Sequence, residues 1–243
     1  MIKAVLFDLD GTLLPMNEEE FKKVYFGAVY QKVKHFGYKP DDLVNAIWFG
    51  TKAMVKNDGT MPNEERFWEA FSTIYPDSRI RDEKEFNDFY HNDFPKLAFA
   101  CAMPIQPLAA PFIKELKNRG YEVIIASNPI FPVVATKARI RWAGLDPDDF
   151  KDITAYENSS FAKPNLKYYE MILERNNLKP EEVIMIGNDV REDMIVNKLG
   201  IDSYLITDCL LNLDNEDINK YKHGTFKEIM DLVLARLWCL RSH

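Results

Sequence analysis

The stretch from Ile2 to Thr12 reads IKAVLFDLDGT, and it decides the fold of the chain. Its first part is a short, nearly continuous run of apolar residues that ends at Asp8. Such a run is typical of a strand that is buried on both faces of a parallel sheet. We therefore expect a central β-strand over Ile2 to Asp8, followed by a polar loop that contains Asp10 and Gly11.

Three later apolar runs share this character, and a helical segment precedes each of them. The runs are Glu122 to Ala126, Val183 to Ile186 and Ser203 to Ile206, and the segments are Pro111 to Arg119, Leu166 to Asn176 and Glu192 to Leu199. Two of these segments stop at a glycine of the C-cap type, Gly120 or Gly200. A weaker strand is expected over Asp152 to Tyr156. Alternating strands and helices predict an α/β fold with a doubly wound, mostly parallel, Rossmann-like sheet.

The residues from about Pro15 to Phe99 interrupt this alternation. Apolar residues recur there at helical spacing, as in Phe21, Val24 and Tyr25, and the stretch holds 17 of the chain's 31 aromatic residues. We expect an all-helical domain over residues 15–99, inserted into a core domain made of residues 1–14 and 100–243. Thr225 and Glu228 are spaced as a capping box and predict a final helix.

The composition is that of an ordinary folded protein, with 47% hydrophobic and 28% charged residues. A net charge of −7 argues against a general affinity for nucleic acid or for membrane surfaces, because both attract a basic face. The N-terminus shows no signal-peptide pattern and no stretch approaches about 18 apolar residues, so we expect a cytoplasmic protein. Cys101, Cys209 and Cys239 are far apart, and we expect reduced, mostly buried thiols.

Asp8 and Asp10 follow the first strand, at the carboxyl edge where an open α/β sheet places its ligand site. Residues two apart in an extended chain point the same way, so the two carboxylates can converge. Two such charges repel unless a cation lies between them, and oxygen ligands of this kind suit Mg²⁺. Taken alone, the Asp-Leu-Asp-Gly segment could also be a simple turn.

Polar side chains at the other strand ends favour the ligand site over the turn. Ser127 and Asn128 close the second run, and Lys163 with Pro164 follows the weaker strand. The third run ends in the acidic segment from Gly187 to Asp193. Because the carboxyl ends of parallel strands meet at one edge, these groups are expected to surround one ligand.

With these motifs in this order, the sequence resembles the haloacid dehalogenase (HAD) superfamily over nearly the whole chain. The segment from Asp8 to Thr12 matches its first motif, DxDGT, and Ser127 matches the second. Lys163 matches the third, and the Gly187 to Asp193 segment matches the acidic fourth. The inserted helices have the position of the family's C1 cap, which closes over the site and selects the leaving group.

The resemblance implies a role for each motif residue. Asp8 would be the nucleophile and would carry an aspartyl-phosphate, while Asp10 would act as general acid and base. Mg²⁺ would be held by Asp8, the main-chain carbonyl of Asp10 and a group of the fourth motif. Phosphate oxygens would be bound by Ser127, Asn128 and Lys163.

The fourth motif departs from the Gly-Asp start of many relatives, since Asn188 follows Gly187. Either Asn188 or Asp189 could complete the metal site, and we favour Asp189 because a carboxylate offsets more of the cation's charge. Asp193 is expected to orient Lys163 or a metal-bound water, and Thr12 to support the same site.

We therefore predict a Mg²⁺-dependent phosphatase that hydrolyses a small phosphorylated metabolite, as a monomer or homodimer. A phosphomutase on the same scaffold and a catalytically silent HAD-fold binding protein stay open as alternatives. A dehalogenase is disfavoured because Asp10 is present, and a phosphonatase would need Lys52 or Lys56 as a Schiff-base lysine. Candidate pocket residues in the cap are Tyr25, Trp48, Lys52, Arg66 and Trp68.

Overall fold

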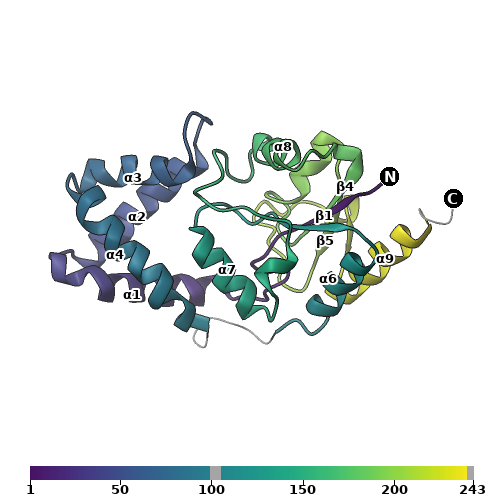
Figure 1. The fold of residues 1–243 in the computed structure, drawn as a ribbon, viewed down its shortest axis with the longest axis horizontal. Coiled ribbons are helices and arrows are strands. Elements are labelled where there is room, and N and C mark those ends of the chain that lie inside the picture. The colour runs from purple at the N-terminus through teal and green to yellow at the C-terminus, as the bar shows by residue number, and fades with distance from the viewer. Residues whose placement is uncertain (99–104, 240–243) are drawn as a thin grey trace.

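The computed structural model describes residues 1–98 and 105–239, which form an α/β half and a helical half (Figure 1). The sheet consists of β1 (Ala4–Phe7), β2 (Glu122–Ile125), β3 (Asp152–Ile153), β4 (Val183–Gly187), β5 (Asp202–Ile206) and β6 (Lys222–Gly224). The six strands lie in the order β3-β2-β1-β4-β5-β6, and every pair is parallel. The predicted doubly wound α/β class is therefore confirmed.

Two strands at the sheet edges differ from the prediction. β3 ends at Ile153 instead of Tyr156, because the chain then turns and the Tyr156 N–H donates to the carbonyl of Phe131 (3.0 Å). β6 was not predicted, because Lys222 and His223 are exposed and offer no apolar run. The four apolar runs form β1, β2, β4 and β5 at the centre, where both faces of the sheet are covered.

Within the described residues, four α-helices accompany the strands: α6 (Ala109–Asn118), α7 (Val133–Trp142), α8 (Leu166–Arg175) and α9 (Phe226–Cys239). Short 3-10 helices lie between them: η3 (Pro147–Asp149), η4 (Pro180–Glu182), η5 (Met194–Leu199) and η6 (Ile218–Lys220). The predicted helix from Glu192 to Leu199 is thus a 3-10 helix that begins at Met194. α7 has no counterpart in the prediction. The glycine stops are confirmed, since Gly120 and Gly200 have φ of 75° and 80°.

The helical half contains α1 (Glu18–Val33), α2 (Pro40–Val55), α3 (Asn63–Ile74) and α4 (Ser78–Asn92), together with η1 (Lys34–Phe36) and η2 (Phe94–Leu97). Its aromatic residues pack on one another, as in the T-shaped contacts of Trp68 with Phe71 and Phe86, at ring-centroid distances of 5.7 and 5.6 Å. The helical character of the insert agrees with the prediction. Its boundary at residues 99 and 100 lies outside the described residues and stays a prediction.

The contacts that join the halves include two sets. Trp142 of α7 stacks on Phe94 at 5.1 Å, and its Nε1 donates to the carbonyl of Pro95 (3.2 Å). Asn63, which is fully buried, donates from Nδ2 to the carbonyls of Pro129 (3.1 Å) and Phe161 (3.3 Å), and from its main-chain N to Ser159 (2.8 Å). We call this second set the Asn63 joint. It holds the start of α3 against loops of the α/β half.

The strand register brings the polar strand ends to one edge. Phe7 lies opposite Ile125 of β2 and Ile186 of β4, and the next residue, Asp8, donates from its N–H to the Ile186 carbonyl (2.9 Å). The residues that follow these strands therefore leave the sheet side by side.

No helix within the described residues is long and apolar enough to cross a membrane. Cys209 is a free thiol that is partly exposed, contrary to the expected burial. Cys101 and the side chain of Cys239 lie outside the described part of the chain.

Candidate active site

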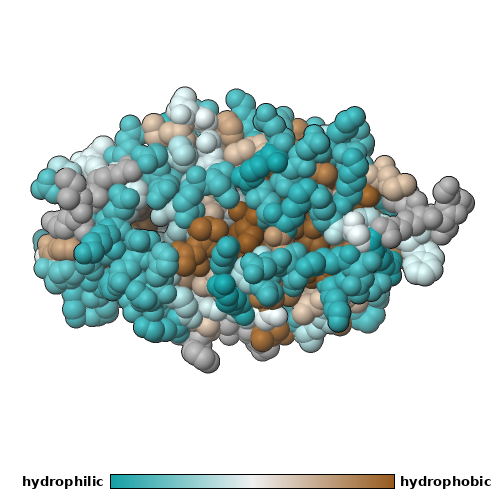
Figure 2. All heavy atoms as spheres, viewed as in Figure 1, coloured by the Kyte–Doolittle hydropathy of each residue, from teal (hydrophilic) through white to brown (hydrophobic). Residues whose placement is uncertain are grey.

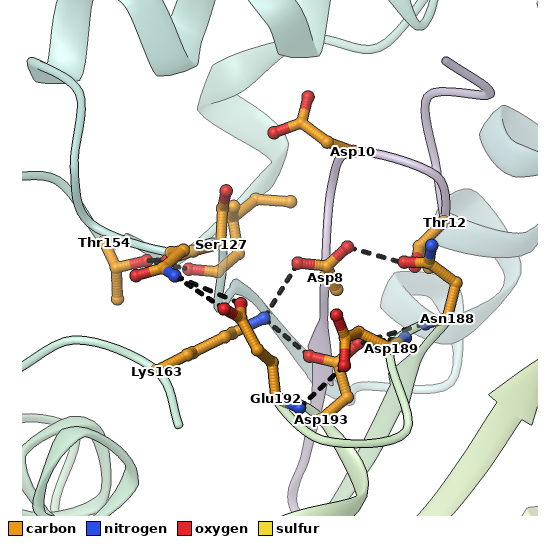
Figure 3. Close-up of polar contacts among 12 residues, drawn as sticks. Asp8, Asp10, Thr12, Ser127, Thr154, Lys163, Asn188, Asp189, Glu192 and Asp193 are labelled. Carbon is orange, nitrogen blue, oxygen red and sulfur yellow. Dashed lines mark hydrogen bonds and ion pairs between the residues drawn. The ribbon is translucent and has the colours of Figure 1, made fainter. Parts of the chain in front are cut away.

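Asp8 stands at the centre of the polar cluster, with 8% of its surface exposed (Figure 3). Its Oδ1 accepts a hydrogen bond from Lys163 Nζ at 2.8 Å, and its Oδ2 accepts one from the Thr12 hydroxyl at 3.1 Å. Both contacts fix the direction of the carboxylate.

Lys163 lies between two carboxylates, with its side chain 1% exposed. Its Nζ donates to Asp193 Oδ1 at 2.6 Å as well as to Asp8. Burial alone would lower the pKa of the Lys163 ammonium, but Asp193 and Asp8 outweigh burial and raise this pKa well above its ordinary value. The site therefore holds a permanent positive charge beside Asp8.

Asp193 connects Lys163 to the loop after β4. Its Oδ2 accepts the main-chain N–H groups of Asn188 and Asp189, each at 3.0 Å. This carboxylate has almost no exposed surface, so its three donors take the place of water around it. One side chain thus fixes both the ammonium and the loop that carries the candidate metal ligands.

Asn188 and Asp189 differ in what their side chains already contact. Asn188 Oδ1 accepts the Thr12 hydroxyl (3.0 Å), and its Nδ2 donates to the carbonyl of Cys209 (2.7 Å). The amide oxygen therefore faces the hydroxyl that also donates to Asp8. Asp189 Oδ1 instead accepts the N–H groups of Arg191 and Glu192, each at 2.8 Å, and so caps its own loop.

Gly11 occupies a conformation that this geometry requires. Its φ is 86°, and a Cβ there would overlap the side-chain amide of Asn188. The chain passes so close to Asn188 only because Gly11 has no side chain.

We expect the Gly11→Ala variant to lose about 1–3 kcal/mol of unfolding free energy through backbone strain, and to lose activity because Asn188 is displaced. The matched control is Gly37→Ala, where φ is 84° but nothing lies within 4 Å of the new Cβ. Urea titrations and turnover measurements on both variants separate strain from displacement. Equal activity in the two variants would show that the Asn188 contact is irrelevant.

Asp10 faces a different neighbour, and Figure 3 shows its carboxylate turned away from that of Asp8. Its Oδ2 forms an ion pair with Arg139 of α7, whose guanidinium lies over the ring of Phe131 at 4.7 Å. Burial raises the pKa of Asp10 to about 6, with Arg139 acting against this rise. Its Oδ1 is buried without a hydrogen-bond partner among the described residues.

Ser127 and Asn128 lie beside Asp8 on the loop after β2, and both line the same cavity. The Ser127 carbonyl accepts hydrogen bonds from the hydroxyls of Thr154 (2.7 Å) and Tyr168 (2.8 Å). Asn128 Nδ2 donates to both carboxylate oxygens of Glu192 at 3.1 Å, and its Oδ1 is buried without a partner in the described structure. The structure therefore brings the polar ends of four strands to one place.

A family model for haloacid dehalogenase-like hydrolases matches residues 2–198. The chain is a haloacid dehalogenase-like hydrolase. The hydrolase is 22% identical over 243 residues to a glyceraldehyde 3-phosphate phosphatase of Methanothermobacter thermautotrophicus, an alignment that covers 90% of this chain and 92% of that protein. It is 26% identical to a ribulose-1,5-bisphosphate 5-phosphatase of Halopiger xanaduensis, with 84% of each chain covered.

A solved structure of similar fold is a HAD phosphatase from Thermococcus onnurineus. The TM-score is 0.58 at 20% identity, and the match covers 96% of the hydrolase and 98% of that chain. This structural similarity supports the assignment of the hydrolase to the same fold.

One cavity of about 860 Å³ joins the cluster to the helical half. Asp8, Asp10, Ser127, Asn188 and Asp189 line it from the sheet edge. Of the candidate pocket residues in the cap of the hydrolase, Tyr25, Trp48 and Trp68 line the cavity. Lys52 and Lys56 are exposed and are not among the lining residues, and Arg66 instead pairs with Asp58 (3.1 Å) and Glu69 (2.7 Å).

Three residues of the hydrolase's site had no role in the sequence prediction. Arg139 was missed because α7 itself was not predicted. Thr154 was part of the predicted weak strand, and its hydroxyl, together with that of Tyr168, donates to the main-chain carbonyl of Ser127. Glu192 belonged to the predicted acidic segment, but its contact with Asn128 joins two loops that no sequence spacing connects. Burial raises the pKa of Glu192 to about 7.

Proposed function

We propose that the hydrolase is a Mg²⁺-dependent phosphatase that acts on a small phosphorylated metabolite through an aspartyl-phosphate on Asp8. The observation that carries the proposal is the buried carboxylate of Asp8, which Lys163 and Thr12 hold at the floor of a cavity. The relatives named as phosphatases support phosphate monoesters as the substrate class.

In the proposed first step, a carboxylate oxygen of Asp8 forms a bond to phosphorus while the bond from phosphorus to the leaving oxygen breaks. Asp10 supplies a proton to that leaving oxygen. In the second step, water attacks the aspartyl-phosphate, Asp10 takes a proton from it, and Asp8 is released with inorganic phosphate. Lys163, with Ser127 and Asn128 nearby, supplies polar partners for the phosphate oxygens.

The charges of the site support a divalent cation. Asp8, Asp10, Asp189, Glu192 and Asp193 line the cavity, while Lys163 and Arg139 are the basic groups among the described residues that pair with members of this cluster. A phosphate dianion would be repelled by the excess of carboxylates unless further positive charge were present. Bound Mg²⁺ would neutralise charge on the phosphate and allow one anion to approach another.

The available donors fit Mg²⁺ better than a cation that needs a full protein cage. The described residues include no group of three or more His, Cys, Asp or Glu side chains placed to hold a metal. Mg²⁺ usually keeps several waters and takes one or two carboxylates together with substrate oxygens. Asp8, the carbonyl of Asp10 and one group of the fourth motif would suffice.

For that last ligand we now favour Asn188 over Asp189. Asn188 Oδ1 and Asp8 Oδ2 both accept the Thr12 hydroxyl, so the two oxygens lie close to one another. One oxygen of Asp189 is already engaged by two main-chain N–H groups. Asp189 would then set the shape of the loop and add negative charge nearby.

We expect purified protein to release inorganic phosphate from a panel of phosphate monoesters in the presence of Mg²⁺. Removal of the metal with EDTA should reduce turnover to background, and excess Mg²⁺ should restore it, because the carboxylate excess then has a counter-ion. Phosphate release measured with a colorimetric assay checks both expectations. Turnover that persists in EDTA would contradict metal dependence, and no turnover on any ester would contradict the phosphatase.

A further inference from the structure

The end of the cavity away from Asp8 is walled by aromatic side chains. Ten aromatic residues line the cavity, and eight of them belong to the helical half. Trp48 is among them although 45% of its surface is exposed. Figure 2 shows apolar residues gathered in the middle of one face, where the two halves meet. The volume of about 860 Å³ is near the upper end for sites that enclose drug-sized ligands.

The rings of this wall are arranged for contact with a further ring. Phe26 lies 5.5 Å from Trp48 and 5.2 Å from Tyr25 between ring centroids, and both pairs are tilted. Tyr25 makes a T-shaped contact with Phe131 at 5.4 Å. Such a set presents both ring faces and ring edges, which are the surfaces that aromatic groups prefer to contact.

Several polar atoms of this wall are already hydrogen-bonded within the protein, although the buried Nε1 of Trp68 has no partner among the described residues. The hydroxyls of Tyr25 and Tyr90 are hydrogen-bonded at 2.7 Å, and the Thr51 hydroxyl donates to the carbonyl of Ile47 at 2.9 Å. A sugar-like leaving group would bury several hydroxyls against this wall with few partners beyond Trp68 Nε1, and each hydroxyl left unpaired would weaken binding. The wall therefore favours an apolar leaving group over a polyol.

The charges around the cavity favour a substrate with a single phosphate. Among the described lining residues, the basic ones are Lys22 and Arg139. Lys22 pairs with Glu18 (3.0 Å) and Glu19 (3.1 Å), and Arg139 pairs with Asp10. A second phosphate, as in a bisphosphate, would meet, among the described lining residues, only cations that already pair with carboxylates.

From these observations we propose that the substrate is a phosphate monoester whose leaving alcohol carries a planar aromatic ring, held against Trp48 and Phe26. The phosphate lies at Asp8 and the ring lies in the helical half. This inference rests on the proposed phosphatase function and narrows its substrate class.

The test compares pairs of phosphate esters with the same type of leaving alcohol, one member of each pair with an aromatic ring and the other without. Adenosine 5′-monophosphate is paired with ribose 5-phosphate, and 2-phenylethyl phosphate with ethyl phosphate; octyl phosphate supplies apolar bulk without a ring. We expect kcat/KM to be about tenfold or more higher for the ring-bearing member of each pair. We also expect 2-phenylethyl phosphate to exceed octyl phosphate.

Variants of the wall give a second measurement. Trp48→Ala and Phe26→Ala should each lower kcat/KM for the esters with an aromatic ring by about tenfold, mainly through KM, and so reduce the ratio of kcat/KM between adenosine 5′-monophosphate and ribose 5-phosphate. Trp238→Ala is the matched control, since Trp238 is 66% exposed and lies on α9 outside the cavity. Circular dichroism confirms that each variant is folded.

The outcomes test the aromatic leaving group and the proposed phosphatase activity separately. Turnover of ribose 5-phosphate and ethyl phosphate as efficient as that of their ring-bearing partners would overturn the inference and leave the phosphatase intact. Octyl phosphate equal to 2-phenylethyl phosphate would also overturn it, since apolar bulk would then be what is selected. Failure of all five esters, together with a wider panel, would instead overturn the phosphatase itself.

Discussion

The Asp8→Asn variant is expected to lose phosphatase turnover by at least about 10⁴-fold while it remains folded. The amide is neutral and is a poor nucleophile, so no aspartyl-phosphate can form. The fold should persist because the amide oxygen can still accept from Lys163 and the amide nitrogen can donate to the Thr12 hydroxyl. Lys163 also keeps Asp193 as its partner. Phosphate release at saturating substrate and Mg²⁺, with thermal melting beside it, measures both effects.

The matched control makes the same chemical change elsewhere in the cavity. Asp208 lines the cavity, and its carboxylate accepts the N–H of Phe226 at 2.8 Å. Asp208→Asn keeps that acceptor and should retain activity. If Asp8→Asn retained turnover within a few-fold of the unaltered protein, Asp8 would not be the nucleophile.

The Lys163→Met variant is expected to lose about 3–5 kcal/mol of unfolding free energy, because two buried carboxylates lose their shared cation. Activity should also fall by about 10²-fold or more, since phosphate loses a positive partner. Urea denaturation and phosphate release give the two quantities. Lys167→Met is the control, because Lys167 lies four residues further on and is exposed.

A double variant separates the two roles of Lys163. Lys163→Met combined with Asp193→Asn removes one of the uncompensated charges and should recover part of the lost stability. It should not recover activity, because the ammonium beside Asp8 is still missing. A Lys163→Met protein as stable as the unaltered one would show that the ion pairs contribute nothing to the fold.

The sheet could be predicted from the sequence because its central strands are continuous apolar runs. β1, β2, β4 and β5 are covered on both faces, so apolar residues dominate their sequences, although β2 begins with Glu122 and β5 with Asp202 and Ser203. The edge strands β3 and β6 lack such apolar runs. β6 has no buried face to impose a pattern, and β3 is held through main-chain hydrogen bonds that carry little sequence signal.

The grouping of the site could be predicted because parallel strands end at a common edge. Asp8, Ser127 and Asn188 were placed together by that argument alone. The contact of Arg139 with Asp10 could not be predicted, because it depends on how α7 packs between the two halves. The pairing of Asn128 with Glu192 is likewise a matter of loop geometry.

The same reasoning explains which residues of the insert were placed correctly. Tyr25, Trp48 and Trp68 were pocket candidates, and all three line the cavity. Arg66 and Lys52 were also candidates, but they are not among the lining residues. Their actual partners and exposure depend on helix orientation, which the spacing of apolar residues fixes only roughly.

The Asn63 joint has a consequence for the energetics of ligand binding. Two of its acceptors, the carbonyls of Pro129 and Phe161, stand one residue after Asn128 and two residues before Lys163. Two equilibria that share a structural element are linked, and the linkage is reciprocal. If the packing of α3 against these loops increases their affinity for phosphate, bound phosphate must shift the equilibrium toward the packed position of α3 by the same factor. The same coupling free energy would then appear in two measurements: the affinity for inorganic phosphate, and the equilibrium for separation of the helical half from the α/β half.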